Sequence, residues 1–262
     1  LLDAFRGRYG RTPMQYLREV RLRRAQELLL TTTLPVTDIA AQVGFLRAHP
    51  DVTVVGTRLR LFPAAALRPG MRRWVAWHNA LLTHTEMARE VLVESPLAHA
   101  TALLRRDAVE RAGGWRDRGW PEDVDLWLRL LESGARFAKL PRVLYAWRQH
   151  PASATWRDPA FSRERIQALQ EHSLDRGFLR GRREVALVAV GSSLGRWASA
   201  LSGRGLHVRV LECGKPHPGP RPTASLRPPI VLVFGAAPAR RRWREALTAS
   251  GMEEGRDFLF VG

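Results

Sequence analysis

The segment Trp120-Pro121-Glu122-Asp123-Val124-Asp125-Leu126-Trp127-Leu128-Arg129 indicates the fold of this chain more clearly than any other. Proline suits the first position of a helix, where its missing N–H would have no partner. Three acids then fill the first turn, where the positive end of the helix dipole favours negative charge. Leu126, Trp127 and Leu130 follow at helical spacing, so we expect one face of this helix to be buried. Asp125 and Arg129 stand four residues apart and are expected to pair along the other side.

Three groups of residues in this part of the chain follow one another in a fixed order. They are Gly113-Gly114-Trp115, then Glu122-Asp123-Val124-Asp125-Leu126-Trp127-Leu128-Arg129, then Tyr145-Ala146-Trp147-Arg148-Gln149-His150. The series resembles the second half of a family 2 glycosyltransferase of the GT-A fold, from about Leu46 to Asp158. The resemblance implies transfer of a sugar from a nucleotide-sugar to a hydroxyl of a sugar or lipid-linked acceptor.

The resemblance also implies a role for each matching residue. Asp123 corresponds to the general base that takes a proton from the acceptor hydroxyl, with Glu122 and Asp125 as supporting acids. His150 corresponds to a histidine that contacts the diphosphate or a metal. Trp115 and Trp120 are candidates for stacking on a sugar ring, although nine tryptophans in the chain make core packing the favoured explanation. For the three acids the alternative is a structural one, the stabilisation of a helix start.

Composition limits the class of protein. The chain has 262 residues, 45% of them hydrophobic, which allows one large domain or two to three small ones. Its net charge is +17, and Lys139 and Lys215 are the only lysines among 42 basic residues. Positive charge favours phosphate-bearing partners, including nucleic acid and nucleotide-sugars. Arginine spread this evenly is more typical of coding bias than of a concentrated nucleic-acid surface.

A cytoplasmic location is the expectation from the remaining composition. Cys213 is the only cysteine, so no disulfide can form within the chain. The apolar runs Val185–Val190 and Ile230–Phe234 are far shorter than the ~20 residues that span a bilayer, so no transmembrane segment is expected. No basic-then-apolar leader opens the sequence.

The first 45 residues predict helices. Thr12-Pro13 is a helix start, and helical periodicity continues to Leu29. A second short helix is expected from Val36 to Val43, ended by Gly44. The segments Gly10-Arg11-Thr12-Pro13-Met14-Gln15-Tyr16-Leu17 and Ile39-Ala40-Ala41-Gln42-Val43-Gly44-Phe45 resemble part of the AraC-type helix-turn-helix domain.

The element that would read bases is not visible in this segment. In such domains the second helix of the pair enters the major groove. Here Leu46-Arg47-Ala48-His49-Pro50 follows instead, and Pro50 leaves fewer than two turns of helix. Arg18, Arg21, Arg23 and Arg24 are candidate contacts to DNA phosphates, which position a protein without specifying a sequence. A solvated basic face on a packing helix is the alternative.

The nucleotide-sugar half of a GT-A enzyme is also missing from its expected place. In the resembled family an Asp-x-Asp motif holds a divalent cation, Mg²⁺ or Mn²⁺, on the leaving diphosphate, because a hard cation with carboxylate ligands neutralises that charge. No Asp-x-Asp precedes Asp51, and the only such spacing is Asp123-Val124-Asp125. We therefore expect impaired sugar transfer by this chain alone.

The predicted elements after Asp51 alternate between strands and helices, and the fold class is α/β. Strands are expected at 52–57, 100–104, 137–140, 143–147, 185–190, 208–211, 230–234 and 258–261. Helices are expected at 70–82, from a Thr85 cap to Glu90, from Asp107 to a close at Gly113-Gly114, from Pro121 onward, within 159–183, after Gly191 to Leu201, and at 240–250. Alternation in the last part predicts a small parallel sheet, resembling the Rossmann-like tail of some bacterial glycosyltransferases. Val190 and Ser192 stand where a dinucleotide fingerprint ending at Gly195 needs glycine.

The predicted organisation has four parts: a partial helix-turn-helix (1–45), an acceptor-side half of a GT-A domain (46–158), a helical connector (159–183) and a small Rossmann-like domain (184–262). Three hypotheses follow. The chain is a glycosyltransferase-like protein lacking its donor half, an AraC-type sequence-specific DNA-binding transcription regulator, or a fused or truncated reading frame with neither activity. A junction near residues 44–50 supports the third hypothesis, because there each resemblance lacks the part that would carry its binding chemistry.

Overall fold

The computed structural model describes residues 36–151, 153–213 and 226–262. The chain divides into residues 1–48 and residues 49–262. In the first unit, helix α3 spans Val36–Ala48 and passes Gly44, where we predicted its end. A single glycine inside a helix costs only about 1 kcal/mol, so it does not by itself stop one. The predicted helix from Thr12 to Leu29 and its four arginines lie outside the described residues.

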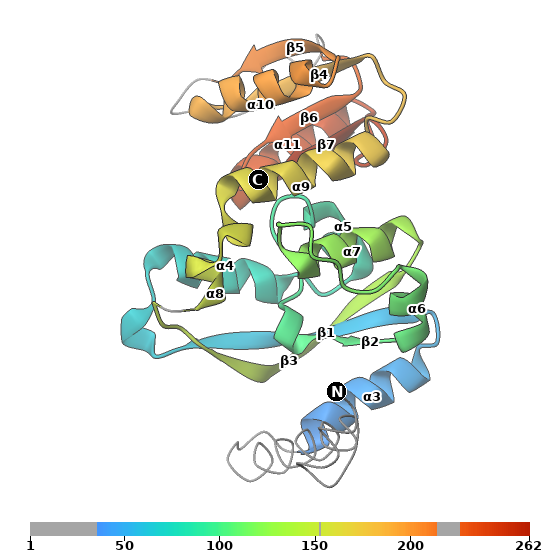
Figure 1. The fold of residues 1–262 in the computed structure, drawn as a ribbon, viewed down its shortest axis with the longest axis vertical. Coiled ribbons are helices and arrows are strands. Elements are labelled where there is room, and N and C mark those ends of the chain that lie inside the picture. The colour runs from blue at the N-terminus through green and yellow to red at the C-terminus, as the bar shows by residue number, and fades with distance from the viewer. Residues whose placement is uncertain (1–35, 152, 214–225) are drawn as a thin grey trace, which may run out of the picture. The chain divides into compact units, whose positions relative to one another are not determined.

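The second unit begins with a three-stranded sheet in the order β2-β1-β3 (Figure 1). β1 (Val52–Phe62) runs antiparallel to β2 (Leu103–Leu104) and parallel to β3 (Arg136–Arg148). The prediction of two strands separated by Pro141 is wrong, because β3 continues past it. Thr57 faces Leu140 and the next residue of β1 faces Val143, so Pro141 falls in a bulge that needs no N–H.

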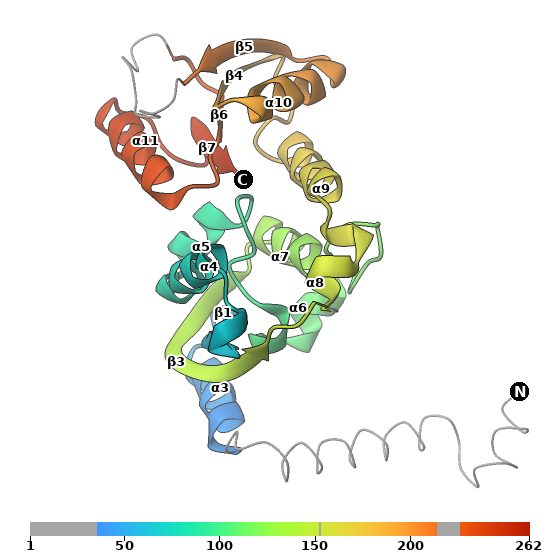
Figure 2. The ribbon, with the colours of Figure 1, turned by 90° about the vertical axis from the view of Figure 1, so that its left-hand side faces the viewer.

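The helices of residues 52–161 lie on one side of this sheet (Figures 1 and 2). They are η1 (Ala64–Ala66), α4 (Pro69–Ala80), α5 (His84–Glu90), η2 (His99–Thr101), α6 (Arg106–Arg111), α7 (Glu122–Glu132), α8 (Ala154–Arg157) and η3 (Pro159–Phe161). Helix α9 (Arg163–Arg176) follows, with Leu169 in the core of this sheet and Leu174 in a core of the C-terminal sheet. Leu126, Trp127 and Leu130 of α7 are buried in one core with Val54 and Phe137 of the sheet, as their spacing predicted.

Two predicted boundaries in this part need correction. Thr83, not Thr85, caps α5: its hydroxyl accepts from Glu86 N at 3.3 Å, and Glu86 Oε2 accepts from Thr83 N at 2.9 Å. A Glu three residues after the capping Thr completes this box, and only Thr83 has one. The strand expected at 100–104 shortens to Leu103–Leu104, because η2 occupies its first half.

The last part of the chain forms the predicted parallel sheet, in the order β5-β4-β6-β7. Its elements are β4 (Glu184–Ala189), α10 (Ser192–Gly203), β5 (His207–Glu212), β6 (Ile230–Val233), α11 (Ala237–Ala249) and β7 (Phe258–Val261). Val185 and Leu187 pack in one core with α10, while Ala186 and Val188 pack in another with α11. Figure 2 shows these helices on opposite faces, which explains the unbroken apolar run of β4. Among the described helices, none has the length and apolar character that crossing a bilayer requires.

A buried lysine and histidine link α4 to β3. Lys139 is 4% exposed and His78 is fully buried. Lys139 Nζ donates to His78 O. Burial lowers the pKa of Lys139 to about 7, helped by the nearby Arg58 guanidinium. Burial and Lys139 lower the pKa of His78 to about 3, and its Nε2 accepts from Ala98 N at 3.2 Å. Both groups are therefore poised to be neutral inside the fold.

We expect Lys139 to give the protein a stability that rises with pH. Between pH 7 and the unfolded value of 10.5 the unfolded chain holds a proton that the native one does not, so the free energy of unfolding increases across this window. Lys139→Met should remove most of that rise, a change on the order of a few kcal/mol. The measurement is urea unfolding from pH 6.5 to 10.5.

Arg148→Met is the matched control, because Arg148 is an exposed cation on the same strand. It should leave the pH profile as in the wild type. An unchanged profile in Lys139→Met would contradict the assignment of the titration to this lysine.

Candidate functional site

A cavity of about 710 Å³ lies in the second unit, within the size range of small-molecule sites. Its walls come from the start of α4, the segment after α5, the first turns of α7, the end of β3, and the α8–α9 region. Most of its lining is aliphatic or aromatic, including Trp74, Tyr145, Trp147, Trp156 and Phe161. The charged lining residues are Arg68, Glu94, Glu122 and Asp123, together with the titratable His99.

Asp123 lies in the wall of this cavity, half-buried in the first turn of α7. Its Oδ1 accepts from Val124 N at 2.8 Å. Burial raises the pKa of Asp123, and the Glu122 carboxylate adds to the rise. A carboxylate with a raised pKa is a stronger base, which suits removal of a proton from a hydroxyl.

Glu94 is a second acid of the same cavity. It keeps exposed surface because it faces the cavity, yet the surrounding protein raises the pKa of its carboxyl, and the charge of Asp123 raises it further. Ser95 N donates to Glu94 Oε1 at 3.0 Å. The negative charge of Asp123 therefore disfavours ionisation of Glu94 in this cavity.

Glu122 and His99 both line the cavity, and His99 contacts Glu122 and Trp115. Glu122 Oε1 lies 3.8 Å from His99 Nδ1. The His99 ring stacks on Trp115, with centroids 4.4 Å apart. Trp115 is 43% exposed and lies behind His99, outside the cavity lining.

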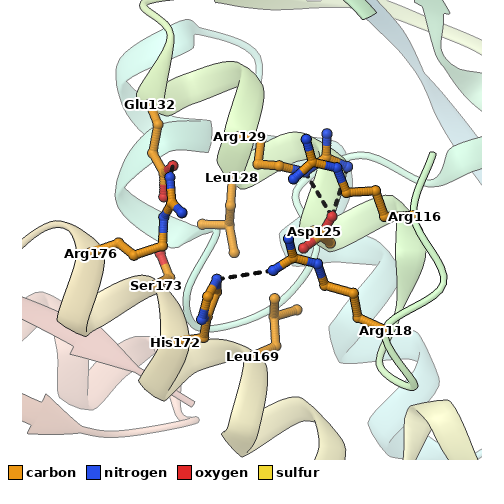
Figure 3. Close-up of a pocket in the computed structure, with 10 residues that line it drawn as sticks. All are labelled: Arg116, Arg118, Asp125, Leu128, Arg129, Glu132, Leu169, His172, Ser173 and Arg176. Carbon is orange, nitrogen blue, oxygen red and sulfur yellow. Dashed lines mark hydrogen bonds and ion pairs between the residues drawn. The ribbon is translucent and has the colours of Figure 1, made fainter. Parts of the chain in front are cut away.

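Asp125 faces a separate, small cavity of about 20 Å³, next to α9 (Figure 3). It is 3% exposed, and its Oδ2 lies 2.7 Å from Arg129 Nη2, so the predicted pair forms but is buried. Trp120 Nε1 donates to Asp125 Oδ1 at 3.2 Å. Arg129 also donates to Gly114 O at 2.9 Å and to Ala112 O. These contacts join the glycine turn to α7.

His150 follows the end of β3 and is exposed. It lines neither the large nor the small cavity. In the part of the chain that the structure describes, no group of three or more His, Cys, Asp or Glu side chains is arranged to hold a metal ion. Asp123 and Asp125 face different cavities, so this pair does not fit a shared cation.

Sequence reasoning missed Glu94, His99 and most of the aromatic wall. Glu94 lies in the irregular segment between α5 and η2, and His99 begins η2; no periodicity or motif marks either residue. Trp147 stands in the group 145–150, but no role at the site was predicted for it or for Trp74; their ring centroids lie 5.9 Å apart, edge to face. Only contact across the fold brings these side chains to Asp123.

Comparison with known proteins supports both resemblances. Residues 1–49 match the family model of a helix-turn-helix domain, which agrees with the AraC-type resemblance of this segment. No solved structure matches the chain.

Three curated proteins share a stretch of this chain's sequence. The amylovoran biosynthesis glycosyltransferase AmsE of Erwinia amylovora is 27% identical over 103 residues, 39% of this chain and 36% of its own length. An uncharacterized glycosyltransferase of Haemophilus influenzae is 28% identical over 103 residues, with the same two shares. The putative glycosyltransferase EpsE of Bacillus subtilis is 32% identical over 111 residues, 41% of this chain and 37% of its own. The chain thus spans little more than a third of the length of these relatives and is glycosyltransferase-like over that part.

The two aspartates of α7 should respond differently to the same substitution. Asp125→Asn leaves the largely buried Arg129 without its charged partner, so we expect a loss of about 3–5 kcal/mol in the free energy of unfolding. Asp123→Asn should leave stability within about 1 kcal/mol or raise it at neutral pH. The raised pKa of Asp123 means that the wild type loses stability as pH rises above the unfolded value of 3.8, and Asn removes that loss.

Urea unfolding of both variants at pH 4 and pH 7 measures the difference. Each variant serves as the control for the other, because both lie on one helix and make the same chemical change. Equal destabilisation would assign Asp123 to the helix start rather than to a site.

Proposed function

We propose that residues from about 46 to 158 form the acceptor-side half of a family 2 glycosyltransferase, with Asp123 as the general base. The observation that carries this proposal is the position of Asp123 in the wall of a ligand-sized cavity, with a raised pKa. The likeness to three glycosyltransferases supports it. Glu122 and Glu94 would tune this base, while Asp125 would position it through Arg129.

In the proposed reaction Asp123 takes the proton of an acceptor hydroxyl. The oxygen forms a bond to the sugar's anomeric carbon as the bond from that carbon to the diphosphate breaks. The acceptor is a sugar or a lipid-linked sugar, and the aromatic wall suits either, because rings stack on sugars and pack on chains. Trp120, whose indole N–H is bound to Asp125, would support the base rather than stack on substrate.

We also propose that this chain alone transfers no sugar. No Asp-x-Asp motif precedes Asp51 in the sequence, and the described residues do not fit a Mg²⁺ or Mn²⁺ site. The nucleotide-sugar and its cation would then need residues that this chain does not supply. We assign no metal role to His150.

A calorimetric titration separates the two parts of the proposal. We expect no binding of uridine-, guanosine- or thymidine-diphosphate sugars, with or without Mn²⁺. We expect n-octyl β-glucoside, below its micelle concentration, to bind and to lose at least about tenfold in affinity in Trp147→Ala, because that ring lines the cavity.

Trp115→Ala is the control, since that ring lies outside the cavity lining. Magnesium-dependent sugar transfer by the purified chain would overturn the proposed impairment. Absence of octyl glucoside binding, or equal loss in both tryptophan variants, would overturn the acceptor site.

The helix-turn-helix match favours a second candidate function, binding to DNA through residues 1–49. Arg18, Arg21, Arg23 and Arg24 would contact phosphates. In the described part of the chain only three residues separate α3 from β1, so no recognition helix follows α3. We therefore propose phosphate contacts without base reading.

Fluorescence anisotropy with duplexes of unrelated sequence tests this second candidate. Affinity should be alike across sequences and fall steeply with salt, and replacing the four arginines with Gln should reduce the slope of log K against log salt by up to about 4. The same change at the exposed Arg163, Arg180, Arg241 and Arg242 controls for net charge. Preference for one sequence would contradict the missing recognition helix, and no binding at low salt would reject DNA as a partner.

A further inference from the structure

We infer that the C-terminal sheet holds one wall of the large cavity in position, with Arg240 as a positioning residue for Glu94. The wall segment is defined here as residues 90–95, and the tail as residues 184–262. This inference deepens the proposed function, because the wall segment carries the acid that faces Asp123. In this inference the tail positions a wall of the cavity and does not itself have to bind a ligand.

Glu90 connects the tail to the wall segment. It ends α5 and is 7% exposed. Its Oε2 accepts from Arg240 Nη2 at 2.6 Å and its Oε1 from Arg244 Nη2 at 3.1 Å, both from α11. Its backbone oxygen accepts from Val93 N at 2.8 Å and from Glu94 N at 3.0 Å. One residue therefore binds the tail through its side chain and sets the turn that carries Glu94 through its backbone.

Arg240 is itself firmly held. It is 2% exposed, and its Nη1 donates to Phe234 O at 3.0 Å and to Gly235 O at 2.7 Å, at the end of β6. A buried ion pair adds little net stability compared with apolar packing, and in some proteins such pairs instead fix one arrangement of the groups around them. The pair between Glu90 and Arg240 thus fits a positioning role better than a purely stabilising one.

A second attachment joins the wall segment to the end of β7. Gly262 N donates to Leu92 O at 3.3 Å, and Gln170 Nε2 donates to Leu92 O at 2.8 Å. A Cβ on Gly262 would lie 2.3 Å from Val93 O, so the two backbones are in close contact. Leu92 and Val93 pack against the two cores of the tail and also line the cavity.

Two variants perturb this attachment from different elements of the full chain. Arg240→Met removes the cation that Glu90 faces, and Gly262→Ala forces Val93 away without removing any charge. In both, the raised pKa of Glu94 should fall toward its ordinary value, because water reaches the carboxyl once the wall segment moves. Amide exchange at Val93 and Glu94 should quicken at least about tenfold.

The measurements are a carboxyl ¹³C NMR titration, with Glu94 assigned by Glu94→Gln, and native-state hydrogen exchange. Arg241→Met is the matched control, an exposed neighbour on the same helix, and should change neither. Gly262→Ala keeps the test decisive if Arg240→Met does not fold. Unchanged titration of Glu94 and unchanged amide exchange in a folded variant would overturn the inference, whether or not octyl glucoside binds. Failure of octyl glucoside to bind, with the titration and exchange changed as expected, would overturn only the proposed function.

Discussion

The buried pair between Asp125 and Arg129 determines how the candidate site is built. Arg129 reaches from α7 to the carbonyl of Gly114, so the glycine turn and the first turn of the helix are held together. Successive helical residues are about 100° apart, and Asp123 and Asp125 therefore point in directions about 200° apart. Asp125 is held in the ion pair with Arg129, and Asp123 faces the large cavity. On a strand the same spacing would place both acids on one face, where they could share a cation.

The parts of the fold that follow from local patterns were predictable. The apolar residues of α7 recur at helical spacing, which predicts one buried face, and the unbroken apolar run of β4 predicts a strand buried on both faces. The structure has both. Pro141 misled the prediction, since a bulge opposite β1 removes its cost and only the partner strand supplies that bulge. The site was predictable in part for the same reason. Asp123 stands in a motif, whereas Glu94 and His99 reach it from a segment without periodicity, so their proximity is a property of the tertiary fold.

Burial is the main cause of the pKa shifts of four ionisable groups in the second unit. Lys139 sits near His78 with both pKa values lowered, whereas Asp123 and Glu94 have theirs raised. Each shift favours the neutral form, as expected where desolvation exceeds pairing. The carboxyl of Glu90, outside this set, lies against the guanidinium groups of Arg240 and Arg244, 2.6 and 3.1 Å away.

The tail's own sequence favours a role through contact over a role through a nucleotide. Val190 and Ser192 replace the glycines that would let a pyrophosphate approach the backbone after β4. The tail's contacts with the first part of the unit are a buried arginine on α11, a close backbone contact at Gly262, and apolar contacts to Leu92 and Val93. All three converge on the residues beside Glu94. A sheet can set the geometry of a neighbouring carboxylate without contacting a ligand, because a closely packed interior transmits displacements.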